Sequence, residues 1–141
     1  MSLFAKLFTG AVLALITLVS VAPAATYVYV SNAEDGTIGM YAMASDGTLT
    51  PGARVQAQKL VMPMAVSPDK RFLYAAARTK PYTVFTFGID PKTGALTQLS
   101  KTPTAENLVN ISTDKTGKYL FGASFTAALV SVNPIGKGGK V

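Results

Sequence analysis

Apolar and polar positions repeat along this chain at intervals of about 45 residues. Three segments each begin with an aromatic residue and continue as a largely apolar run: Tyr27–Asn32, Phe72–Arg78 and Tyr119–Phe125. They start 45 and 47 residues apart. A second mark, Asp46–Thr50, recurs as Thr93–Thr97 after 47 residues. Such a fixed period indicates a repeat architecture, which decides how every shorter motif is interpreted.

The second unit predicts four short strands separated by turn signals that contain Pro, Asp or Gly. The expected strands are Ala65–Ser67, Phe72–Ala77, Thr83–Ile89 and Ala95–Lys101. Residues 73–77 are apolar at every position, whereas a sheet covered on one face would alternate. Four antiparallel strands in about 45 residues, with both faces covered, are typical of a propeller blade.

The chain is therefore predicted to be all-β, an incomplete β-propeller of about two and a half four-stranded antiparallel blades over residues 25–135. The first unit lacks an innermost strand, and the third ends after Val130–Pro134 without an outermost strand. Residues 136–141 are rich in Gly and Lys and are predicted to be a flexible tail.

The N-terminal segment has the three parts of a secretory signal. Lys6 precedes an apolar run over residues 7–21, and Ala22-Pro23-Ala24 supplies small residues for a signal peptidase. We expect a signal-peptide helix over residues 1–24, cleavage after Ala24 or Ala25, and a periplasmic or secreted product. A retained anchor is the alternative, but about 15 apolar residues fall short of the roughly 20 that span a bilayer. No stable membrane span is expected after cleavage.

Charge and composition narrow the chemistry. Thirteen Lys and Arg oppose seven Asp and Glu, giving +6, and the basic residues are scattered, which argues against nucleic acid and favours small anionic ligands. The chain has no Cys and no His, which excludes disulfides, a Cys nucleophile and a Ser-His-Asp triad. Asp46, Asp90 and Asp114 lie in turn signals and are too dispersed for a calcium loop. We predict no metal and no cofactor.

Three stretches in this order, Met64–Tyr74, Asp90–Thr97 and Ile111–Val132, resemble the bacterial seven-bladed β-propeller lactonases, the 6-phosphogluconolactonase-like proteins. The resemblance implies hydrolysis of a lactone, with a small anionic or lactone substrate. Seven blades require roughly 300 residues, so the chain resembles an N-terminal portion and is expected to be inactive alone. Residues that would match the family's His and other acid–base groups lie in later blades, so none is assigned here.

Tyr29–Asn32 also resembles an exported propeller repeat of the Tyr-Val-Thr-Asn type. The alternative function is therefore a non-catalytic module that binds a partner or a surface ligand. Open blade edges would in either case favour self-association, because unpaired strands recruit other strands.

In a propeller, the second strand of each blade ends at the face that binds substrate in this family. That geometry places Asn32, Arg78 and Phe125 at this face, with the inter-blade loops Gln58–Pro63 and Thr104–Asn107. Arg78, Asn32 and Asn107 are the candidate substrate-binding residues, because guanidinium and amide groups hold carboxylate or phosphate. Glu106 is the candidate general base for water. A solvated loop arginine and an exposed loop acid remain the alternative interpretations of Arg78 and Glu106.

Overall fold

The computed structural model describes residues 25–141. The predicted signal peptide, with its helix, lies outside these residues. Within the described part, no helix is long and apolar enough to cross a membrane.

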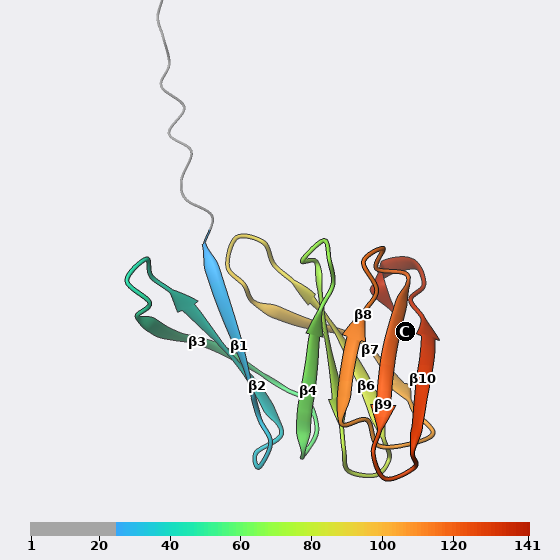
Figure 1. The fold of residues 1–141 in the computed structure, drawn as a ribbon. Coiled ribbons are helices and arrows are strands. Elements are labelled where there is room, and N and C mark those ends of the chain that lie inside the picture. The colour runs from blue at the N-terminus through green and yellow to red at the C-terminus, as the bar shows by residue number, and fades with distance from the viewer. Residues whose placement is uncertain (1–24) are drawn as a thin grey trace, which may run out of the picture.

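Ten strands form three antiparallel sheets that stand side by side (Figure 1). We call the sheets blades 1, 2 and 3. Blade 1 contains β1 (Thr26–Asn32), β2 (Thr37–Met43) and β3 (Leu49–Gln56). Blade 2 contains β4 (Val61–Val66), β5 (Phe72–Ala77), β6 (Thr83–Ile89) and β7 (Leu96–Pro103). Blade 3 contains β8 (Asn110–Thr113), β9 (Tyr119–Ser124) and β10 (Leu129–Pro134), and a 3-10 turn follows at Lys137–Gly139.

This arrangement confirms the predicted partial propeller, with a four-stranded middle blade between two three-stranded blades. The predicted bounds of β5 and β6 agree with the structure. The strand β4 begins at Val61, four residues before the predicted start at Ala65. The sequence does not predict this beginning, because Pro63 is typical of a turn. The pairing of β4 with β5 is irregular between Val61 and Met64. Pro is tolerated there because β4 is the edge strand of its sheet.

The edge strands β1, β4 and β8 adjoin one another, so one side of the array is a row of edge strands. Side chains connect this row. The Ser31 hydroxyl donates to the Met62 carbonyl over 3.1 Å, and the Thr113 hydroxyl donates to the Val66 carbonyl over 3.4 Å. The outer strands β3 and β7 meet on the other side.

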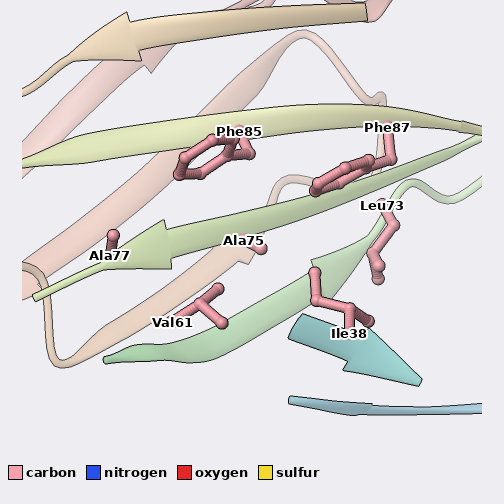
Figure 2. Close-up of a cluster of buried hydrophobic side chains, with 7 residues drawn as sticks. All are labelled: Ile38, Val61, Leu73, Ala75, Ala77, Phe85 and Phe87. Atoms are coloured by element: carbon pink, nitrogen blue, oxygen red, sulfur yellow. The ribbon is translucent and has the colours of Figure 1, made fainter. Parts of the chain in front are cut away.

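The first core lies between blades 1 and 2. Figure 2 shows its buried side chains converging from both sheets. Phe85 and Phe87 provide the largest surfaces, with ring centroids 6.1 Å apart. Complete burial of one such side chain stabilises a fold by about 1.5–3 kcal/mol. The buried members are Ile38, Val61, Leu73, Ala75, Ala77, Phe85 and Phe87.

The second core lies between blades 2 and 3 and uses the opposite face of the same two strands, β5 and β6. Tyr74 is 1% exposed there, and burial raises the pKa of its hydroxyl to about 12. The buried members are Tyr74, Ala76, Val84, Leu108, Ile111 and Leu120. Successive residues of β5 therefore enter different cores, which explains why residues 73–77 are uniformly apolar.

Aspartate side chains organise four turns at the end of the array that is uppermost in Figure 1. Each carboxylate accepts a backbone N–H from a residue a few positions later, as Asp114 does from Tyr119 over 2.9 Å. Hydroxyl donors, from Ser67 to Asp69 and from Thr116 to Asp114, and these backbone donors stabilise the ionised carboxylate and lower its pKa. The turn residues with lowered pKa values are Asp46, Asp69, Asp90 and Asp114.

Residues 136–141 have defined contacts, whereas the sequence predicts a flexible tail there. Gly139 is buried at a φ of +75°, and a Cβ at this position would lie 2.6 Å from the Phe72 ring. The Val141 carbonyl accepts a hydrogen bond from the Thr102 hydroxyl over 2.8 Å. The glycines permit this approach because they carry no side chain, a feature that also suggests flexibility when the sequence is considered alone.

We predict that Asp114→Asn lowers the free energy of unfolding at pH 7 and that the difference from the parent disappears near pH 2. The hydrogen bond from the Thr116 hydroxyl, with the backbone donors, lowers the folded-state pKa of Asp114 to about 2, against about 3.9 in an unfolded chain. The stabilisation is therefore complete above about pH 4 and is lost as the pH falls toward 2. Urea unfolding followed by circular dichroism between pH 2 and pH 7 measures it.

Glu34→Gln is the matched control, because Glu34 is exposed and has no hydrogen bond to another described residue. Its unfolding free energy should follow the parent curve. A constant difference between Asp114→Asn and the parent down to pH 2 would contradict the assignment.

Candidate functional site

Five loops lie at the lower end of the array in Figure 1, which we call the crossover end. Both connections between blades pass there, and the strands β1, β5 and β9 end there. The loops pack closely: Gly36 has a φ of +71°, and a Cβ on it would lie 2.7 Å from the Lys59 nitrogen. The loops span residues 33–36, 57–60, 78–82, 104–109 and 125–128.

Arg78 reaches from the end of β5 toward the row of edge strands. Its backbone N–H donates to the Leu60 carbonyl over 3.1 Å, and its Nη1 lies 3.5 Å from the Met62 sulfur. The Nε atom is buried and has no hydrogen-bond partner among the described residues. A buried donor without a partner costs about 1–3 kcal/mol, which an arriving anion would offset.

Asn32 is engaged within its own hairpin. Its amide donates to the Thr37 hydroxyl over 3.2 Å, and that hydroxyl donates to the Asp35 carboxylate over 2.8 Å. The structure therefore places Asn32 at the crossover end, as its position in the strand predicts, but its side chain has no hydrogen bond with Arg78.

Asn107 connects two loops of blade 3, because its amide nitrogen donates to the Thr126 hydroxyl over 3.4 Å. Its Oδ1 atom is buried and has no partner among the described residues. Phe125 follows the next strand and is 86% exposed. Loops from blades 2 and 3 thus each carry one buried polar atom that a ligand could satisfy.

Glu106 lines an open hollow of about 570 Å³ at the crossover end, which neither Arg78 nor Asn107 lines. The candidate base and the candidate anion-binding group are therefore not brought into one pocket by these residues. The hollow is lined by Lys80, Pro81, Tyr82, Pro103, Thr104, Ala105 and Glu106.

Lys80 is a cation of this hollow that the sequence analysis missed. It stands two residues after Arg78, and its Nζ lies 5.9 Å from the centroid of the Tyr82 ring. The sequence around Lys80 predicts a turn, because Pro81 follows it. A second cation two residues after Arg78, at the same end of the array, was the signal that could have identified it.

Gln58 holds the same loop in place. Its amide nitrogen donates to the Thr79 carbonyl over 2.9 Å and to the Pro81 carbonyl over 3.2 Å. The Thr79 hydroxyl in turn donates to the Lys59 carbonyl over 2.7 Å. The loop that carries Arg78 and Lys80 is thus fixed to the connection between blades 1 and 2.

A second hollow, of about 850 Å³, lies between blades 1 and 2 at the opposite end. Tyr27 and Phe72 give it aromatic walls, and Arg71 lies there within 3.9 Å of the Asp69 carboxylate. The guanidinium at that end is therefore already paired, in contrast to the buried Nε of Arg78. Within residues 25–141, no cluster of three or more His, Cys, Asp or Glu side chains could hold a metal ion.

The chemistry available at the crossover end is anion binding. A guanidinium can hold a carboxylate or phosphate through two parallel hydrogen bonds. Hydrolysis of a lactone further requires a base that activates water and a donor that stabilises the oxyanion. Arg78 and Glu106 are groups of these two types, but they line different surfaces.

Comparison with known proteins shows which family the chain resembles. The family model described as "Lactonase, 7-bladed beta-propeller" matches residues 27–141. The chain belongs to this lactonase family. The architecture of this family is a ring of seven blades. The described residues form three neighbouring sheets of this kind.

Curated members of the lactonase family are similar over most of this chain. The 6-phosphogluconolactonase of Enterobacter sp. (strain 638) is 37% identical over 111 residues, which cover 79% of this chain and 33% of that protein. The 6-phosphogluconolactonase of Cronobacter sakazakii is 38% identical over 105 residues, covering 74% and 31%. The chain spans about a third of the length of the curated relatives it matches.

Solved lactonase-type structures agree with the fold. A proposed 6-phosphogluconolactonase from Bacteroides fragilis superposes with a TM-score of 0.75 at 26% identity, covering 82% of this chain and 33% of that chain. A periplasmic gluconolactonase from Pseudomonas aeruginosa gives a TM-score of 0.65 at 24% identity, covering 82% and 35%. The latter likeness concerns the fold alone.

Proposed function

We propose that this chain forms part of a lactonase of the 6-phosphogluconolactonase type and that Arg78 binds the anionic group of the substrate. Membership of the family and the names of the curated relatives support the reaction class. The observation that carries the residue assignment is the buried Nε of Arg78, which has no partner among the described residues.

We further propose that these residues bind the substrate without hydrolysing it. Glu106 and Arg78 line different surfaces, and the 141 residues contain no His that could replace Glu106 as base. Asn107, with its unpartnered Oδ1, would contribute to binding, and Asn32 would support the hairpin beside it. The share of about a third of the relatives' length is consistent with a partial site.

The alternative function, a propeller module that binds a partner without any relation to lactones, has less support. Its sequence motif, Tyr29–Asn32, is satisfied by hydrogen bonds inside the array: the Tyr29 hydroxyl donates to the Gly94 carbonyl and the Asn32 amide donates to Thr37. These contacts support a structural role for the motif, in packing against blade 2 and within the β1–β2 hairpin.

We predict that the full chain binds 6-phosphogluconate, the product of the proposed reaction, and that Arg78→Ala weakens this binding about tenfold or more. A hydrogen bond to a charged group contributes about 1.5–3 kcal/mol, and 1.4 kcal/mol corresponds to a factor of ten. Arg78→Lys should recover part of the affinity, because it keeps the charge and loses the fork geometry. Isothermal titration calorimetry measures the three affinities.

Arg71→Ala, which removes a guanidinium from the opposite end, is the matched control and should leave the affinity unchanged. Equal affinities for Arg78→Ala and the parent would refute the assignment of Arg78. Hydrolysis of 6-phosphogluconolactone is followed on the same samples, and we expect no rate above that of the spontaneous reaction. Turnover that Glu106→Gln abolishes would instead show that the chain is catalytic alone.

We also propose that the protein is exported to the periplasm or beyond, with removal of residues 1–24 or 1–25. The support is the pattern of Lys6, the apolar run and Ala22-Pro23-Ala24. Intact mass measured on the protein from the periplasmic fraction of a bacterial host should give a chain that begins at Ala25 or Thr26. A full-length chain in the cytoplasmic fraction would contradict export.

A further inference from the structure

Met62 contacts the cation that the proposed function assigns to the substrate. Its sulfur lies 3.5 Å from Nη1 of Arg78, which donates to it. A thioether sulfur is a weak hydrogen-bond acceptor, so a stronger acceptor can take its place beside the guanidinium. Met62 is 44% exposed, and small oxidants can therefore reach its side chain. An accessible, oxidisable sulfur thus lies within hydrogen-bonding distance of the candidate anion-binding group.

The contact belongs to the middle blade and lies on the side that faces blade 3. Val61 and Ala77 pair with each other and are buried in the first core, between blades 1 and 2. Met62 and Arg78 are the next residues along the chain. Because neighbouring side chains of a strand point to opposite faces, both are directed away from that core. The strand β4 is flanked by β1 on one side and by β8 on the other, so the exposure of Met62 is not that of an outer blade.

We propose that Met62 is a site of reversible oxidation and that its sulfoxide oxygen accepts a hydrogen bond from Arg78, which withdraws the guanidinium from the substrate. This inference rests on the proposed function of Arg78 and adds a means of regulating it. The oxidant is a peroxide. Hydrogen peroxide transfers one oxygen atom to the sulfur: its O–O bond breaks, an S–O bond forms and water leaves. The sulfur loses the two electrons that the peroxide gains, and methionine sulfoxide reductases reverse the change.

Oxidation converts a weak partner of the guanidinium into a strong one. An oxygen bonded to a sulfur that lies 3.5 Å from Nη1 comes within ordinary hydrogen-bonding distance of this nitrogen. Hydrogen bonds from an ionised donor are shorter and roughly twice as strong as those between neutral groups. The sulfoxide and an arriving anion compete for the same donors. The affinity for the anion therefore falls by the factor by which the new bond stabilises the unliganded protein.

Met43 provides a matched control for this chemistry. It is 39% exposed, close to the 44% of Met62, so peroxide should oxidise both. Met43 is the last residue of β2, at the end of the array opposite to Arg78. Its sulfoxide should therefore leave the guanidinium free, and only oxidation of Met62 should change anion binding.

The first experiment compares binding of 6-phosphogluconate before and after treatment with hydrogen peroxide. Calorimetry gives the affinities of the full chain and of Met62→Leu, Met43→Leu and Arg78→Ala, and peptide mass spectrometry gives the oxidised fraction of each methionine. Oxidation should weaken binding about threefold or more in the parent and in Met43→Leu. It should leave the affinities of Met62→Leu and Arg78→Ala unchanged. Methionine sulfoxide reductases should restore the affinity of the oxidised parent.

Three results of this experiment would overturn the proposal. They are an unchanged affinity of the parent when Met62 is oxidised, an equal loss of affinity in Met62→Leu, and a Met62 that stays reduced where Met43 is oxidised. Circular dichroism confirms that the oxidised samples remain folded.

The second experiment tests the new hydrogen bond without a ligand. Met62→Gln places an amide oxygen at the position along the side chain that the sulfoxide oxygen occupies. Urea unfolding is measured for the parent, Met62→Gln, Arg78→Ala and the double variant. The effect of Met62→Gln on the unfolding equilibrium constant should be more favourable to the folded state, by about threefold or more, when Arg78 is present. Equal effects in both backgrounds would overturn the proposal. A reduced parent that does not bind 6-phosphogluconate would refute the proposed function instead, and the unfolding cycle would still decide whether the bond forms.

Discussion

The burial of one sheet on both faces is the constraint on which the rest of this structure depends. Alternate side chains of β5 enter different cores, with Leu73 facing blade 1 and Tyr74 facing blade 3. Neither outer blade has comparable burial, and each has three strands among the described residues. Blades 1 and 3 are therefore held mainly by what they place against blade 2, such as Ile38 and Leu120. The position of every loop at the crossover end follows from this packing.

The sequence predicted the middle of the array best because burial on both faces leaves an unmistakable pattern. A strand such as β5 is apolar at nearly every position, and its bounds followed directly from that run. The beginning of β4 was missed because Pro63 resembles a strand terminator, although an edge strand accepts it. The order of the repeats also carried the family, which no single motif could have done.

The candidate site was predictable in position and not in detail. Asn32 and Arg78 reach the crossover end because β1 and β5 end there, and Asn107 reaches it through the connection between blades 2 and 3. The direction of each side chain depends on contacts that are distant in sequence, such as Gln58 with the Thr79–Pro81 loop. Consequently Asn32 is satisfied inside its hairpin, and Glu106 lines a hollow with Lys80 and not with Arg78.

The two ends of the array differ in how their polar groups are satisfied. Aspartate turns at one end pair their carboxylates with backbone donors of the same turn, as Asp90 does with Lys92 and Thr93. At the crossover end, buried polar atoms of Arg78 and Asn107 have no partners among the described residues. Local pairing fixes the first end, whereas the second end retains buried polar atoms without partners among the described residues.

Hydrogen exchange of the Phe87→Leu variant, read by mass spectrometry, tests the dependence of blade 1 on blade 2 most directly. Phe87 belongs to blade 2 but packs in the same core as Ile38 of blade 1. A core substitution of this kind costs about 1 kcal/mol, so exchange should accelerate about fivefold. We predict that amides of β1 and β2 accelerate together with those of β5 and β6. Acceleration confined to blade 2, with β1 and β2 unchanged, would show that the blades are independent and would contradict this account.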